Sequence, residues 1–121
     1  MITIKNQNFG VEIEMTGITR TEAATVIANY FGSRVTFEGG YYDTHTATDT
    51  KGRTWKCMYD GSIHCQVVRD GDRVFANKSY SCEVVTPILQ YDDILHPAVQ
   101  GIHPCDPQRV PGHAAAQCVA A

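Results

Sequence analysis

The sequence predicts an α+β domain in which one helix near the N-terminus packs on an antiparallel sheet. Residues 9–17 alternate apolar and acidic side chains, which is typical of a half-buried strand. The next segment carries helix start and stop signals, and short strand-like pieces separated by turn residues follow as far as about residue 89. Because the turns have the composition of hairpin turns, we expect neighbouring strands to pair antiparallel.

The composition fits one modest globular domain. The chain has 121 residues, of which 43% are hydrophobic, so one core is expected. A net charge of -3 and the lack of a basic run interleaved with aromatic residues argue against nucleic acid as a partner. No segment resembles a signal peptide or a membrane span, and five cysteines without a framework spacing predict free thiols. We therefore expect a cytoplasmic protein with no membrane partner.

The first strand is followed by a helix with a clear beginning and end. Thr19 and Glu22 form a capping box, in which the Thr hydroxyl accepts from a free backbone N–H. Gly32 is placed to end the helix in the left-handed conformation. The expected buried stripe recurs at helical spacing and consists of Ala23, Val26, Ile27 and Tyr30.

The strand-like pieces after the helix are short and end at Gly, Asp or Pro. Glycines 39 and 40, the turn at residues 49–52 and the turn at residues 70–72 separate them. Pro87 should stop the last strand, because proline cannot donate to a sheet ladder. The predicted strands cover residues 34–38, 41–48, 54–59, 63–69, 73–76 and 80–89.

The chain changes character near residue 96. Residues 96–121 contain four of the five prolines and show neither a period of two nor one of 3.6, so we expect no stable element there. We divide the chain into a patterned domain at residues 1–95 and an unpatterned, disordered tail at residues 96–121.

The first strand carries two carboxylates on one face. Residues two apart in a strand point the same way, so Glu12 and Glu14 lie roughly 7 Å apart on the face opposite Val11 and Ile13. Like charges side by side repel, which favours a cation between them. A half-buried strand with its polar face in water is the alternative interpretation.

Two later strands repeat this arrangement. Asp60 lies at a strand end beside a glycine, and Glu83 lies between apolar residues in a strand suited to burial. A buried carboxylate without a partner is unfavourable by several kcal/mol, so Glu83 needs a cation, hydrogen bonds or solvent. Four acids on one face of an antiparallel sheet suit a hard divalent cation such as Mg²⁺. Chance alignment among thirteen acidic residues is the alternative.

Four motifs in order resemble the amidoligase family, a group of carboxylate–amine ligases with the glutamine synthetase and glutamate–cysteine ligase fold. The motifs are FGVEIEMTGITR from Phe9, YYDT from Tyr41, WKCMYDGSI from Trp55 and CEVVTPIL from Cys82. The resemblance covers residues 9–94 and implies a curved antiparallel sheet, here a truncated glutamine synthetase-like half domain, whose concave face binds Mg²⁺ and ATP. It implies metal-binding roles for four acids and phosphate or substrate contacts for two further residues. The implied metal ligands are Glu12, Glu14, Asp60 and Glu83. The implied ATP-binding residues are Glu12, Glu14 and Lys56, and the implied catalytic residues are Lys56 and Ser62.

The chemistry of such a family follows from charge. A carboxylate is a poor electrophile, so ATP phosphorylates it to an acyl phosphate, which an amine attacks to leave an amide, ADP and phosphate. Carboxylates that hold Mg²⁺ on the phosphate oxygens serve this reaction. The expected partners are a small-molecule or peptide carboxylate and an amine.

The resemblance stops near residue 94. Family members are longer, and they continue to a His-x-His strand and an arginine, which this chain lacks. We therefore expect an N-terminal fragment of a ligase that is inactive alone. The alternative is a binding or assembly module whose edge strand pairs with another chain. A metal-dependent hydrolase is a third hypothesis.

Overall fold

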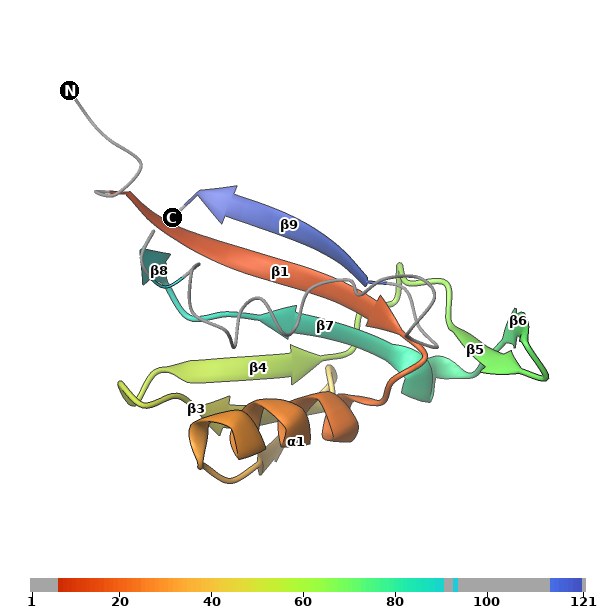
Figure 1. Ribbon diagram of the computed structural model, residues 1–121, viewed down its shortest axis with the longest axis horizontal. Coiled ribbons are helices and arrows are strands. Elements are labelled where there is room, and N and C mark those ends of the chain that lie inside the picture. Colours follow the sequence, from red (N-terminus) through yellow and green to blue (C-terminus); the bar gives the residue numbers. More distant parts are fainter. Residues whose placement is uncertain (1–6, 91–92, 94–113, 121) are drawn as a thin grey trace.

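Within the part of the chain that the structure describes, an open antiparallel sheet carries helix α1 (Arg20–Phe31) on one face, as Figure 1 shows, and a short 3-10 helix (Lys78–Tyr80) precedes β7. This confirms the predicted α+β class. The computed structural model describes residues 7–90, 93 and 114–120. The main sheet contains β1 (Asn8–Thr16), β2 (Thr36–Gly39), β3 (Thr44–Thr48), β4 (Thr54–Met58), β7 (Ser81–Val85), β8 (Leu89–Gln90) and β9 (Ala114–Ala120). A separate two-stranded sheet contains β5 (Gln66–Arg69) and β6 (Asp72–Phe75).

Strand β1 lies at the centre of the site-bearing part of the sheet. It pairs antiparallel with β7, where Glu14 is opposite Glu83, and with β8 and β9. Phe9 is paired with Leu89 and Glu12 with Val85. Two residues separate Phe9 from Glu12 on β1, whereas three residues separate Val85 from Leu89. The extra residue makes the irregularity that separates β7 from β8.

Thr86 fills this irregularity with its side chain. Its hydroxyl oxygen accepts a 3.0 Å hydrogen bond from the N–H of Val11, and its own N–H donates to the carbonyl of Val11 at 3.0 Å. The predicted strand at residues 80–89 is therefore two strands, with the break at Pro87 where the sequence places it.

Helix α1 (Arg20–Phe31) begins and ends as the sequence predicts. The Thr19 hydroxyl accepts from the N–H of Glu22 at 3.2 Å, and Gly32 adopts a positive φ of 69° at the C-terminal end. The predicted buried stripe was partly wrong, because Val26 and Tyr30 are 57% and 48% exposed. The helix residues that pack on the sheet are Ala23, Ala24, Ile27 and Ala28.

Small helix residues allow a bulky sheet residue beneath them. Alanine at three of the four buried helix positions lets α1 lie close to the sheet, and Trp55 of β4, 2% exposed, fills the space below it. Strands β1, β4 and β7 point their other apolar residues to the same side. The core of the sheet face under α1 includes Val11, Ile13, Ala47, Cys57, Cys82 and Val84.

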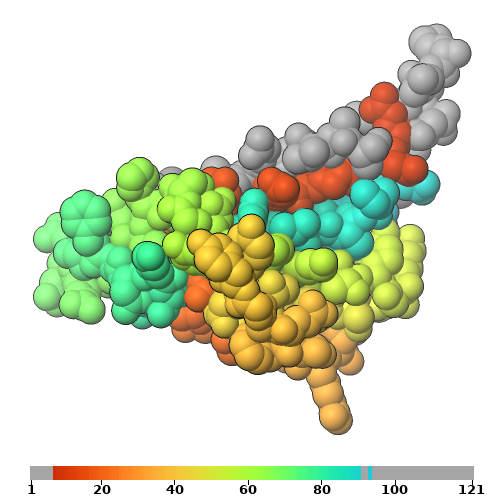
Figure 2. All heavy atoms as spheres, turned by 180° about the vertical axis from the view of Figure 1, so that it is seen from behind, coloured from red at the N-terminus to blue at the C-terminus, as the bar shows by residue number. Residues whose placement is uncertain are grey.

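The hairpin formed by β5 and β6 stands beyond one end of the main sheet. In Figure 2 it is the green group of atoms at the left end of the molecule. Thr16, the last residue of β1, holds its base: the Thr16 hydroxyl accepts from the N–H of Gln66 at 2.8 Å and lies 2.9 Å from the carbonyl oxygen of Tyr80. The hairpin therefore has a fixed position relative to β1.

Part of the predicted tail forms a strand in the structure. Residues 114–120 pair with β1 along Phe9 to Met15, although we expected no element there, because an open strand edge offers backbone partners to a segment without apolar periodicity. Most of residues 96–121 lie outside the described residues, so the division of the chain at residue 95 stays a prediction.

Two further expectations concern thiols and membranes. Cys57, Cys65 and Cys82 are free, as predicted. Among the helices in the described ranges, none has the length and apolar character needed to cross a membrane.

Candidate metal centre

Three carboxylates from three strands or strand ends meet on the sheet face opposite α1. Glu14 of β1, Glu83 of β7 and Asp60, which follows β4, each offer an oxygen within 4.8 Å of the others. Glu14 and Glu83 are direct cross-strand partners, and Met58 is the partner of Glu83 on β4. Partners in a ladder share a face, so the sheet register itself brings the acids together.

Asp60 lies beyond the end of β4 and is held there by a buried serine. The Ser81 hydroxyl accepts from the N–H of Asp60 at 3.0 Å and donates to the carbonyl oxygen of Asp60 at 2.6 Å. Ser81 is fully buried and lies two residues before Glu83 on the same strand. The backbone of Asp60 is thereby fixed to the strand that carries Glu83.

The carboxylate of Asp60 is oriented by its own loop. The backbone N–H and the hydroxyl of Ser62 both donate to Asp60 Oδ1, at 2.8 and 2.7 Å. These hydrogen bonds from Ser62 lower the pKa of Asp60 below its ordinary value. One oxygen of this carboxylate is therefore engaged, and the group is held in its charged form.

Glu83 is the acid most affected by its neighbours. Burial, followed by the negative charges of Glu12 and Asp60, raises its pKa from 4.5 to about 7. A hydrogen bond between the carboxyl groups of Glu83 and Glu12 also contributes, which places Glu12 at the edge of the three-acid group. The structure thus brings all four predicted acids to one face, with Glu12 outside the closest set.

The two other predicted site residues lie on either side of this cluster. Lys56 is an exposed residue of β4 and is paired with Val85, which is also the partner of Glu12 on β1. Lys56 therefore lies on the same face as the acids, one strand beyond β7. Ser62 points its hydroxyl at Asp60, so it contacts the acid cluster directly.

Arg20 at the start of α1 supports the site, although the sequence analysis assigned it no role. Its guanidinium pairs with Asp43 at 2.8 Å and donates to the backbone carbonyls of Lys78 and Ser81. Its Cζ also lies 5.7 Å from the ring centroid of Tyr59, the residue before Asp60. An arginine directly after a helix-capping threonine gave no signal of this role, because its contacts are 58 and 61 residues away.

The spacing of the three carboxylates is close to the spacing that a divalent cation requires. Oxygens on one Mg²⁺ lie at most about 4.2 Å apart, since each Mg–O distance is about 2.1 Å. The observed limit of 4.8 Å among Glu14, Asp60 and Glu83 is less than an ångström wider. Oxygen donors with net negative charge are the ligand set that Mg²⁺ prefers, so the residues present fit the ion.

The chain is similar to a known protein family. No curated protein and no solved structure shows significant similarity to the chain. The family model described as "Putative amidoligase enzyme" matches residues 5–102, which include all four acids, Lys56 and Ser62. The chain therefore belongs to the amidoligase family.

Proposed function

We propose that this protein is an ATP- and Mg²⁺-dependent carboxylate–amine ligase domain whose metal centre is built from Glu14, Asp60 and Glu83, with Glu12 beside them. The observation that carries the proposal is the convergence of three carboxylates within 4.8 Å, with no basic side chain among the described residues forming an ion pair with them. Family membership supports a ligase function in general, and the acid cluster supplies the chemistry that a metal-dependent ligase requires.

Each acid has a distinct task in this proposal. Asp60 stays charged because Ser62 donates to it, so it offers a permanent anionic ligand. Glu83, with a pKa of about 7, exchanges its proton for the cation near neutral pH. Glu14, the cross-strand partner of Glu83, is the third ligand.

Bound ATP would supply the phosphoryl group that converts the substrate carboxylate to an acyl phosphate, leaving ADP, with Mg²⁺ neutralising the phosphate oxygens, and an amine would then displace phosphate to leave an amide. The chain's own residues would neutralise the phosphate oxygens and position the metal ligands. Lys56 offers a mobile ammonium on the face of the acids, where it can pair with phosphate oxygens. Ser62 acts in this proposal as a positioning residue of Asp60, since its hydroxyl is already engaged there.

A binding or assembly module completed by another chain is the second candidate function. Strand β2 pairs only with β3 within the described residues, so it offers an edge to which a strand can be added. Strand β9 covers the outer edge of β1, which reduces the edge available near the acids. We therefore rank the ligase domain first, and we expect the isolated chain to bind the ion and form little or no amide.

Calorimetric titration with Mg²⁺, alone and with a non-hydrolysable ATP analogue, tests the ligase proposal. Glu12→Gln, Asp60→Asn and Glu83→Gln should each weaken Mg²⁺ binding, the last two by about tenfold or more, because each removes one anionic ligand. Glu38→Gln is the matched control, since Glu38 is an exposed acid on β2 and should leave binding unchanged.

One outcome would contradict the metal centre, and another would contradict the expected inactivity of the isolated chain. Equal Mg²⁺ affinity in the wild type and all three site variants would show that the acids bind no ion. Robust ATP-dependent amide formation by this chain would support the ligase but contradict the expectation that it is inactive alone.

A further inference from the structure

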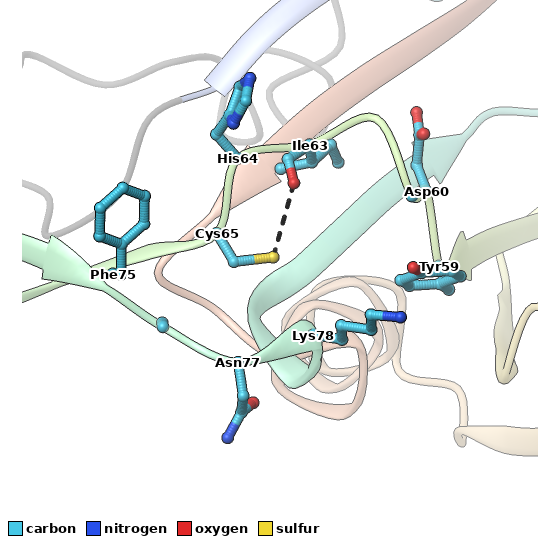
Figure 3. Close-up of a pocket in the computed structure, with 10 residues that line it drawn as sticks. Tyr59, Asp60, Ile63, His64, Cys65, Phe75, Asn77 and Lys78 are labelled. Atoms are coloured by element: carbon cyan, nitrogen blue, oxygen red, sulfur yellow. Dashed lines mark hydrogen bonds between the residues drawn. The ribbon is translucent and has the colours of Figure 1, made fainter.

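A pocket of about 330 Å³ lies beside Asp60, between the loop after β4 and the β5–β6 hairpin. Figure 3 shows residues that line it, including Tyr59, Ile63, Cys65, Phe75 and Lys78. Small-molecule pockets in proteins measure about 300–1,000 Å³. The volume of this pocket is at the lower end of that range, so it suits a small metabolite better than ATP.

One cation, Lys78, and one anion, Asp60, line the pocket. In Figure 3 the side chain of Lys78 extends toward Tyr59, whereas the carboxylate of Asp60 points to the opposite side. Within the described residues, no ion pair involves the Lys78 ammonium. The carboxylate of Asp60 accepts from Ser62 and forms no ion pair with Lys78.

Two cations lie close enough to Cys65 to affect the pKa of its thiol. Burial raises the pKa of the Cys65 thiol, while the charges of Arg20 and Lys78 act to lower it. Cys65 Sγ lies 3.7 Å from the carbonyl oxygen of Ile63, inside the pocket. Lys78 is the cation that lines the pocket, whereas Arg20 acts from outside it and is paired with Asp43.

The pocket is fixed next to the acid cluster. Arg20 donates to the carbonyl of Lys78 at 3.1 Å, and the N–H of Ala76 donates to the carbonyl of Cys65 at 2.9 Å. Asp60 belongs to both sites, because it lines the pocket and contributes a ligand atom to the acid group. A molecule in the pocket can therefore extend past Asp60 toward the acids.

We propose that this pocket binds the acid substrate of the ligase, a small organic acid with two carboxylates. Lys78 pairs with the carboxylate remote from the reaction, Ile63 contacts the methylene chain, and the second carboxylate extends past Asp60 to react. The proposal rests on the proposed function for the identity of the reaction. It excludes an amine in this pocket, because Lys78 repels a second ammonium.

Alkylation of Cys65 by iodoacetamide, located by mass spectrometry, measures occupancy of the pocket without Mg²⁺ or ATP. Succinate, glutarate and adipate are the probes, with neutral glutaramide and cationic 1,3-diaminopropane as comparisons. Cys57 and Cys82 are 1% and 0% exposed, so their alkylation reports unfolding in the same sample. We expect at least one dicarboxylate to slow alkylation of Cys65, and neither comparison compound to do so.

Variants at Lys78 test the assigned contact. Lys78→Met should weaken protection by the dicarboxylate about tenfold, the loss expected for one charge-assisted hydrogen bond, whereas Lys78→Arg should keep it. Lys51→Met removes another exposed lysine, at the β3–β4 turn, and should change nothing. Glu83→Gln should also keep protection, because it alters the metal centre and not the pocket.

The proposal is overturned if no dicarboxylate protects Cys65, if glutaramide or the diamine protects equally, or if Lys78→Met behaves as the wild type. Protection that depends on Lys78, found in a chain that binds no Mg²⁺, would retain the acid site and reject the ligase function. Mg²⁺ binding without protection would do the reverse.

Discussion

The molecule contains two groups of acidic residues whose environments are opposite. At the β3–β4 turn, Asp49 and Asp93 surround Arg53, with Nε–Oδ2 of 2.8 Å to Asp49 and two contacts of 3.2 and 3.3 Å to Asp93. Trp55 Nε1 also donates to Asp49 at 3.1 Å. On the open face, Glu14, Asp60 and Glu83 meet without such cations. Arg53 and Lys51 together neutralise the first group within the fold, whereas the second group is left negative.

The pKa values follow this difference. Burial acts to raise the pKa of Asp93, but hydrogen bonds from Arg53 and from the N–H of Gln90 lower it to about 2. Burial and neighbouring acids raise the pKa of Glu83 to about 7. Acids that stabilise the fold have their countercharge in the chain, whereas acids that await a ligand destabilise it until the ligand binds.

The largest effect is expected from Asp49→Asn at the neutralised group. The Asp49 side chain is 1% exposed and accepts from Trp55, from Arg53 and from the backbone N–H groups of Lys51 and Arg53. An amide cannot accept all of these and leaves Arg53 with less countercharge. We expect the free energy of unfolding to fall by about 3 kcal/mol.

Urea unfolding followed by Trp55 fluorescence measures this change. Asp72→Asn is the matched control, because Asp72 is an exposed residue of β6, and a change within about 0.5 kcal/mol is expected there. Equal stability of Asp49→Asn and the control would mean that the neutralised group does not hold the β3–β4 turn.

A smaller effect is expected where the fold positions the uncompensated acids. Ser81→Ala removes the hydroxyl that both accepts from and donates to the backbone of Asp60. We expect a loss of about 2 kcal/mol in stability, the penalty for unpaired groups of this kind, and weaker Mg²⁺ binding because Asp60 is no longer fixed. Ser79→Ala, an exposed serine of the same segment, is the control.

Thermal unfolding and Mg²⁺ titration on the same two variants separate the effects. A Ser81→Ala variant that loses stability but binds Mg²⁺ as the wild type does would show that Asp60 needs no positioning by Ser81.

The sequence predicts the features that depend on local patterns. The capping residue Thr19 and the terminal Gly32 mark the helix, and alternation along β1 gives the face of Glu12 and Glu14. Proline 87 marks the break between β7 and β8. In each case the signal and the structure it specifies lie within a few residues of each other.

Features that depend on residues distant in the sequence could not be predicted from local patterns. Which side of α1 is buried depends on Trp55 and the strands below it, so Val26 was assigned to the core wrongly. The pairing of β9 with β1 depends on a free strand edge far away in the sequence. The contacts of Arg20 and the ion pair between Arg53 and Asp93 likewise join segments that only the fold brings together.

The smallest expected effect comes from Glu83→Gln, which tests the comparison most directly. In the folded chain the pKa of Glu83 is about 7, above the ordinary 4.5 that we expect in the unfolded chain. Between these values the unfolded chain loses the proton and the folded chain keeps it, so the free energy of unfolding falls as pH rises from about 4.5 to 7 and is constant above. Because Glu83 is only partly buried, solvent screening reduces this contribution to about 1 kcal/mol.

Urea midpoints at pH 4 and pH 8 in the presence of a chelator measure the contribution. Glu83→Gln should lose less stability between these pH values than the wild type, by about 1 kcal/mol, because glutamine cannot ionise. Glu38→Gln should follow the wild type, since Glu38 is exposed on β2. Adding Mg²⁺ at pH 8 should stabilise the wild type, because the ion supplies the countercharge that Glu83 lacks. It should leave Glu83→Gln nearly unchanged, because this variant has lost a ligand of the ion. Parallel pH profiles for the wild type and Glu83→Gln would show that the open-face acids do not repel one another enough to await a cation.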